Sequence, residues 1–221
     1  MSVWRPIGNA LLSTLLAPPC AICEATLEAP LDGAVCQSCW AVIERLTPHE
    51  FSIAPAIRAA TALGEYDGLL RVAIHALKYE GRRSVGPGLS RLMALRAHDL
   101  LEGADLVVPV PLHRGRQRER GFNQSDMLAR GLGVPVSRTL RRTRSTRPQV
   151  GLAAHERREN VADAFTMERR AAGSLLGKVV VLIDDVTTTG ATLDACARVL
   201  IASGARDVRA ITAARVATAP R

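Results

Sequence analysis

Residues 179–193 read Val-Val-Val-Leu-Ile-Asp-Asp-Val-Thr-Thr-Thr-Gly-Ala-Thr-Leu, and this stretch decides the fold. Its first five residues are β-branched or leucine without interruption, which predicts a parallel strand that is covered on both faces. Two carboxylates, hydroxyl residues and a glycine follow, and residues 192–203 have a helical period that ends at Gly204. A buried strand, an acidic end, a polar turn and a helix in this order predict an α/β fold.

The polar turn after this strand has the composition of a phosphate-binding site. Backbone N–H groups of a tight turn and of a helix start bind anions, and threonine hydroxyls add further donors. A sugar phosphate would place its phosphate in the turn and its hydroxyls, or a metal ion, near the two acids. The candidate binding residues are Asp184, Asp185, Thr187, Thr188, Thr189, Gly190, Ala191 and Thr192.

The same stretch resembles the signature of the type I phosphoribosyltransferases. The resemblance implies that the two acids hold the ribose hydroxyls of phosphoribosyl pyrophosphate, that the turn holds its 5′-phosphate, and that Mg2+ accompanies this donor. Two alternatives stay open, because a Walker B strand of a nucleotidase and a phosphoacceptor pocket also end an apolar run in Asp-Asp. A P-loop is disfavoured, since residues 173–178 have the wrong spacing and no Ser or Thr follows the lysine.

Composition limits the class of protein. The 221 residues suffice for one ordinary domain and a small appendage, and 48% hydrophobic with 3% aromatic residues indicates a soluble α/β protein. No apolar run reaches about 18 residues, so we expect no membrane span and a cytoplasmic location. The formal charge of +8 predicts affinity for phosphate-rich small molecules, for nucleic acid, or for both.

The N-terminal segment weakly resembles a signal peptide, with Arg5 before an apolar run. Pro18 and Pro19 occupy the positions where a cleavage site needs small residues, so export is the less favoured alternative. Trp4, Ile7, Leu11 and Leu15 share one helical face. We therefore expect an amphipathic helix over residues 3–16 that packs on the body of the protein.

Four cysteines follow in two C-x2-C pairs separated by twelve residues: Cys20, Cys23, Cys36 and Cys39. Two such pairs can complete a tetrahedral four-thiolate shell, which suits Zn2+. A closed shell of this kind predicts a structural and not a catalytic metal, and disulfides are the alternative in an oxidising compartment. Residues 48–55 are punctuated by prolines and predict a linker, which divides the chain into a zinc domain (1–50) and a phosphoribosyltransferase-like domain (56–221).

The remaining patterns predict further elements of an α/β domain. Residues 69–77 predict a helix with Lys78 at its end, where the side chain reaches toward solvent and either is simply solvated or serves near the anionic ligand. Strands are predicted at 59–66, 105–110, 134–142 and 208–214, and helices at 89–101 and 125–131. Cys196 on the helix after the turn is predicted to pack in the core.

Residues 115–125 form an arginine-dense loop after the strand at 105–110. A solvated basic loop is one interpretation, but ligands of open α/β sheets bind where strands end, and Arg side chains match phosphate oxygens. By position this region resembles the pyrophosphate loop of the phosphoribosyltransferases, at Pro111, Leu112, His113 and Arg114, with positive potential from Arg116, Arg118 and Arg120. The long polar connection at 144–165 would be either a surface loop or a lid.

Several motifs together resemble one family within this superfamily. The two cysteine pairs, Val-Pro-Val-Pro-Leu at 108–112, Arg-Gly-Phe-Asn-Gln at 120–124, Gln149 with Arg158-x-Asn160, and the Asp-Asp-Val-Thr-Thr-Thr-Gly signature occur in the order of the ComF family. The resemblance implies binding of phosphoribosyl pyrophosphate, transfer of ribosyl 5-phosphate to an unidentified nitrogen acceptor, and a link to DNA uptake with single-stranded DNA or a DNA-uptake helicase as partner. A non-catalytic donor-binding or DNA-binding accessory module of the competence machinery is the alternative.

Overall fold

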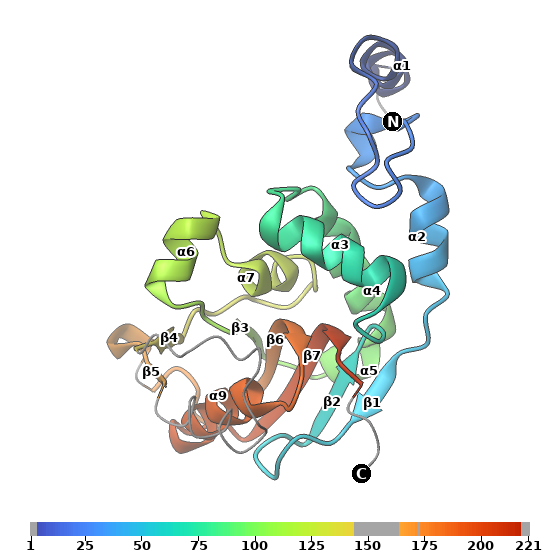
Figure 1. Ribbon diagram of the computed structural model, residues 1–221. Coiled ribbons are helices and arrows are strands. Elements are labelled where there is room, and N and C mark those ends of the chain that lie inside the picture. The colour runs from blue at the N-terminus through green and yellow to red at the C-terminus, as the bar shows by residue number, and fades with distance from the viewer. Residues whose placement is uncertain (1–3, 144–163, 172, 218–221) are drawn as a thin grey trace.

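The structure is a computed structural model that describes residues 4–143, 164–171 and 173–217. Its main sheet has five strands in the order β1-β2-β7-β6-β3 (Figure 1). Only the β1–β2 pair is antiparallel, so the predicted mostly parallel sheet is confirmed. The strands span His49–Phe51 (β1), Ala59–Ala62 (β2), Leu106–Pro109 (β3), Val179–Thr187 (β6) and Asp207–Arg215 (β7).

The predicted signature strand is β6, which lies between β7 and β3 and is buried on both faces. Val181 and Ile183 belong to the core under helices α3, α4 and α7. Val180 and Leu182 belong to a second core under α9. The uninterrupted apolar run is therefore explained by helices on both faces of the sheet (Figure 1). These helices span Gly68–Tyr79 (α3), Val85–Arg96 (α4), Gln124–Ala129 (α7) and Ala191–Ala202 (α9), and the short α5 is His98–Leu101.

The prediction of a strand at 134–142 is wrong for most of these residues. Val136 makes one isolated bridge to Val107, and Pro135 has no N–H with which to continue a ladder. Only Leu140–Arg142 (β4) is a strand, and it pairs antiparallel with Phe165–Met167 (β5), apart from the main sheet. A 3-10 turn, Arg169–Ala171 (η2), follows β5. Residues 144–163 of the connection predicted as a surface loop or a lid lie outside the described residues, and its last residue, Phe165, begins β5.

The arginine-dense stretch is a helix and not a loop, which corrects the sequence interpretation. Arg114–Arg120 forms α6, because Arg, Gln and Glu are strong helix formers. His113 caps its start, where Nδ1 accepts the Gly115 N–H at 3.2 Å. Gly121 ends the helix at φ 73°, a conformation that favours glycine.

The N-terminal part lies at one end of the molecule (Figure 1) and contains α1 (Trp4–Leu16), η1 (Pro30–Asp32) and α2 (Gln37–Glu44). The expected packing of α1 on the body is wrong, since the side of the helix that carries Trp4, Ile7 and Leu11 is exposed. The four-cysteine segment and α2, by contrast, share a continuous core with α3 and α4. Within the described residues, none of the helices is long and apolar enough to cross a bilayer.

The cysteine-containing segment and the domain that contains the main sheet are packed together more closely than the sequence indicated. The predicted linker at 48–55 contains β1, which joins the main sheet beside β2. The Trp40 ring lies so near Gly88 of α4 that a Cβ there would come within 2.2 Å of it. The cysteine-containing segment is thus anchored on the body through α2, although the sequence suggested a separate unit joined by a linker.

Candidate functional site

The two acids of the signature lie within β6, which continues in ladder register with β7 as far as Thr187. Side chains of a strand alternate between its faces, so neighbouring acids enter different surroundings. Asp185 lies on the side of α3, whereas Asp184 contacts Ser125 at the start of α7. We call Asp184 and Asp185 the acid pair. Because their partners differ, the two carboxylates differ in ion pairing and in protonation.

Lys78 is the partner of Asp185, and sequence reasoning missed this contact. Its Nζ lies 2.8 Å from Oδ1 of Asp185, and the two side chains are only 13% and 12% exposed. The expectation that Lys78 reaches toward solvent is therefore wrong. Burial acts to lower the pKa of Lys78, but the charge and hydrogen bond of Asp185 and the charge of Asp184 outweigh it, so the pKa is raised. The ammonium stays protonated and neutralises one acid.

Asp184 is the member of the acid pair that titrates near neutrality. Withdrawal from water and the negative charge of Asp185 raise its pKa to about 7. The Asp185 N–H at 2.9 Å, the charge of Lys78 and the Ser125 hydroxyl at 3.0 Å act in the opposite direction. The acid pair therefore has one carboxylate held by a lysine and a second one that exchanges a proton near pH 7.

The Arg-Gly-Phe-Asn-Gln-Ser stretch at 120–125 links the acid pair to the end of β3. Asn123 caps α7 by accepting the Ser125 N–H at 3.1 Å, and its Nδ2 donates to the Val110 carbonyl at 3.0 Å. Arg120 donates to Oε1 of the fully buried Gln124 at 3.2 Å. The role of Ser125 was missed, although its place two residues after a capping asparagine was the available signal.

The residues 187–192, which we call the phosphate turn, connect β6 to α9. Gly190 has φ 76° and precedes α9, and a Cβ on it would lie 2.3 Å from Cγ2 of Ile53. Only glycine fits this position without strain. The Thr189 hydroxyl accepts the Ala191 N–H at 3.4 Å. The phosphate turn leads directly into the first turn of α9, and the start of a helix is where backbone N–H groups bind anions.

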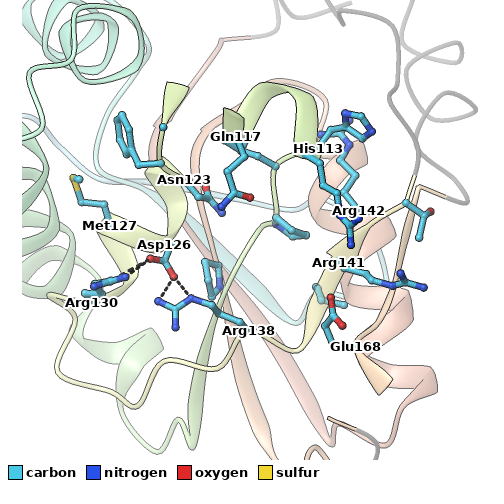
Figure 2. A pocket seen from close by; sticks show the side chains of 18 of the residues that line it. His113, Gln117, Asn123, Asp126, Met127, Arg130, Arg138, Arg141, Arg142 and Glu168 are labelled. Carbon is cyan, nitrogen blue, oxygen red and sulfur yellow. Dashed lines mark hydrogen bonds and ion pairs between the residues drawn. The ribbon is translucent and has the colours of Figure 1, made fainter. Parts of the chain in front are cut away.

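A pocket of about 1080 Å3 lies between α6, α7 and β4 (Figure 2). All four predicted pyrophosphate-loop residues, 111–114, line it together with Asn123 and Asp126 of the α7 region. Among the described lining residues are none of the acid pair or of the phosphate turn. The structure thus separates two predicted halves of the site, and the hydrogen bonds of Asn123 and Ser125 connect them.

The four cysteines meet as the spacing predicted. Their Sγ atoms all lie within 4.8 Å of one another, and Cys23 and Cys36 are 3.7 Å apart. Zn–S bonds of about 2.3 Å in a tetrahedron require S···S distances of about 3.8 Å, so the cluster fits a four-thiolate metal site. Burial opposes ionisation of Cys20, but backbone N–H groups of Cys23, Cys36 and Ile22 lower its pKa to about 7. The described cysteines are all free thiols, and no disulfide joins them.

Comparison with known proteins identifies the family. A family model described as phosphoribosyl transferase domain matches residues 119–220. DNA utilization protein YhgH of Escherichia coli O157:H7 is 34% identical over 165 residues, which cover 70% of this chain and 71% of that protein. Competence protein ComFC of Bacillus subtilis is 34% identical over 99 residues, which cover 45% of this chain and 39% of that protein. The chain belongs to the ComF family. Competence protein F of Haemophilus influenzae is another relative of this ComF protein, 31% identical over 157 residues that cover 66% of this chain and 68% of that one.

Solved structures similar to this ComF protein are more distant. Adenine phosphoribosyltransferase from Leishmania tarentolae is 16% identical, with 76% of this chain and 94% of that chain covered and a TM-score of 0.42. The family assignment confirms the type I phosphoribosyltransferase fold predicted from the signature.

Proposed function

We propose that this ComF protein binds phosphoribosyl pyrophosphate with Mg2+ and transfers ribosyl 5-phosphate to a nitrogen acceptor, with release of pyrophosphate. The observation that carries the proposal is the acid pair, which Lys78 and Ser125 hold at one end of the phosphate turn. A Walker B or phosphoacceptor site would also use the acids, but neither explains the membership in a phosphoribosyl transferase family.

Each half of the site has a role in this reaction. The acid pair accepts hydrogen bonds from the ribose hydroxyls, and the phosphate turn with the start of α9 binds the 5′-phosphate. Residues 111–114 bind the pyrophosphate beside the cationic helix α6. Mg2+ is an oxygen-seeking ion that would neutralise the charge of the donor. Because the leaving group is already activated, the protein contributes mainly position and electrostatic stabilisation.

The proposal is tested by changing both members of the acid pair to asparagine. The change keeps size and replaces charge-assisted hydrogen bonds, each worth about 1.5 to 3 kcal/mol, with neutral ones. We expect the affinity for the Mg2+ complex of the donor to fall about tenfold per residue, at about 1.4 kcal/mol per decade. Calorimetry measures it, and a variant with Asp99→Asn and Glu102→Gln, which removes the same charge elsewhere, serves as the control. Unchanged affinity in the double Asn variant would reassign the ribose site.

The pKa of Asp184 predicts the pH dependence of donor binding. Ribose hydroxyls need the ionised carboxylate as acceptor, and the pKa of Asp184 is raised to about 7. Affinity should therefore be constant above about pH 8 and fall as the pH drops below 7, by at most about tenfold per pH unit for a single proton. Titrations between pH 5.5 and 8.5 measure this, and Asp184→Asn should flatten the profile to what protonation of the ligand itself produces. An equal slope in that variant would exclude Asp184 as the titrating group.

A second candidate role is direct binding of single-stranded DNA, favoured by the exposed arginines of α6 and the names of the relatives. Arg120 is engaged by Gln124 and by the Tyr79 ring, so the test changes Arg116 and Arg118 to Gln. Each lost phosphate contact should reduce the slope of log affinity against log salt by about 0.7. Fluorescence anisotropy with an oligonucleotide measures the slope, and absence of binding at low salt would assign the DNA link to protein partners.

A further inference from the structure

The pocket between α6, α7 and β4 contains arginines that the proposed pyrophosphate loop, residues 111–114, does not include. Six arginines line it and face two carboxylates, within the part of the chain that the structure describes. Its volume of about 1080 Å3 is at the upper end of ordinary small-molecule sites. Residues 111–114 form only one wall, so space and charge remain for a second anionic group.

One side of the pocket is a cationic cluster built on Asp126 of α7. Arg130 donates to Oδ2 of Asp126 through Nε at 3.1 Å and Nη2 at 2.9 Å, and Arg138 donates to Oδ1 at 2.6 Å. The Asp126 side chain is 16% exposed, whereas both arginines are more than half exposed. One carboxylate thus fixes two guanidinium groups and leaves a net positive charge at the pocket (Figure 2).

The opposite side of the pocket is formed by Arg141 and Arg142 of β4 with Glu168, which we call the β4 wall (Figure 2). Arg142 lies over the Phe165 ring at 5.3 Å, and burial together with the charge of Arg116 lowers its pKa. Arg141 is exposed, and its side chain has no hydrogen bond or ion pair to another described residue. Because the β4 wall has two arginines and one glutamate, its net positive charge repels cations and attracts an oxyanion.

We propose that the β4 wall and Arg138 form a second oxyanion subsite, which binds the acceptor of the ribosyl transfer through a phosphate or carboxylate group. The identity of the ligand as the acceptor rests on the proposed function, whereas the anion site itself does not. Guanidinium groups on two sides of a pocket suit a planar or tetrahedral oxyanion, since each can donate two parallel hydrogen bonds. Glu168 restricts where the anion can bind, because its carboxylate repels an anion that approaches it. The same carboxylate can accept a hydrogen bond from an N–H group of the ligand.

The test uses the full chain and titrates inorganic phosphate and succinate by calorimetry at constant chloride. Arg141→Gln should weaken binding of the preferred anion at least tenfold. Glu168→Gln should tighten it severalfold, because a negative charge leaves the same wall. Arg71→Gln on the outer side of α3 changes net charge equally and should alter the affinity less than twofold.

The opposite signs separate a binding role from a structural one, since damage to the fold would weaken binding in both variants. Tighter binding of phosphate would indicate that the ligand carries a phosphate group, and tighter binding of succinate would indicate a carboxylate group. Equal effects of Arg141→Gln and Arg71→Gln would overturn the subsite, and so would weaker anion binding in Glu168→Gln. Failure of the donor to bind the parent protein would reject the proposed reaction but leave these outcomes for the anion site unchanged.

Discussion

Replacing Cys20 or Cys36 with serine is expected to release a bound zinc ion and unfold the cysteine-containing segment. The four Sγ atoms are within 4.8 Å of one another, so each thiolate supplies one quarter of the shell. Structural Zn2+ contributes on the order of 10 kcal/mol in small zinc peptides, which exceeds what this short segment can gain from its own apolar contacts. Metal analysis of the purified protein and hydrogen exchange over residues 20–44 measure the loss.

The body of the protein should keep its fold in these variants, although not without cost. Trp40 and Ile43 of α2 pack against the core under α3 and α4, so the melting temperature should fall by several degrees. Donor affinity should change less than threefold. Cys196→Ala is the matched control, because this buried thiol lies on α9, away from the cluster, and should leave zinc content unchanged. A serine variant with full zinc content, or a metal-free one with unchanged exchange, would contradict a structural metal.

The central part of the fold was predictable because its signals are local and strong. The run at 179–183 allows little besides a strand covered on both faces, and β6 confirms it. The segment at 134–142 was ambiguous, since Pro135 prevents the ladder that the apolar residues suggest. Propensity for helix in Arg114–Arg120 was overlooked in favour of its charge. Both errors concern short segments, in which a single proline or a run of strong helix formers decides the local structure.

The candidate site was predictable where its residues are neighbours in sequence and not where they come from other elements. The acid pair and the phosphate turn are contiguous, so one motif contains both. Lys78 is more than one hundred residues away from Asp185, and a lysine at a helix end gives no signal that distinguishes a buried ion pair from a solvated side chain. The β4 wall likewise depends on how a two-stranded sheet folds back over the pocket.

These long-range contacts explain how an acid pair can exist in a largely buried strand. Two adjacent carboxylates repel each other, and withdrawal from water penalises both charges. Lys78 neutralises Asp185 from α3, and the Ser125 hydroxyl with the Asp185 N–H stabilises Asp184. The charge state of the acid pair therefore depends on α3 and α7, two helices that come earlier in the chain than β6.

Lys78→Met is expected to destabilise the protein by about 3 kcal/mol at pH 8, because removing one partner of a buried ion pair leaves the other charge uncompensated. The pKa of Asp184 should then rise further above its usual value, since the charge of Lys78 now lowers it. A raised folded-state pKa gives stability that is present at acid pH and lost as the pH rises through it. The loss relative to the parent should therefore be smaller at pH 5 than at pH 8, as measured by urea denaturation.

Lys178→Met provides the control for this prediction. Lys178 pairs with Asp105 at 3.0 Å, but the two side chains are 44% and 35% exposed, so its removal should cost much less stability than removal of Lys78. Adding Asp185→Asn to Lys78→Met should recover part of the stability at pH 8, because the unpaired buried charge is then gone. If the double variant is less stable than Lys78→Met by the full cost of Asp185→Asn alone, the two residues are not coupled, and the acid pair is held by Ser125 and the strand alone.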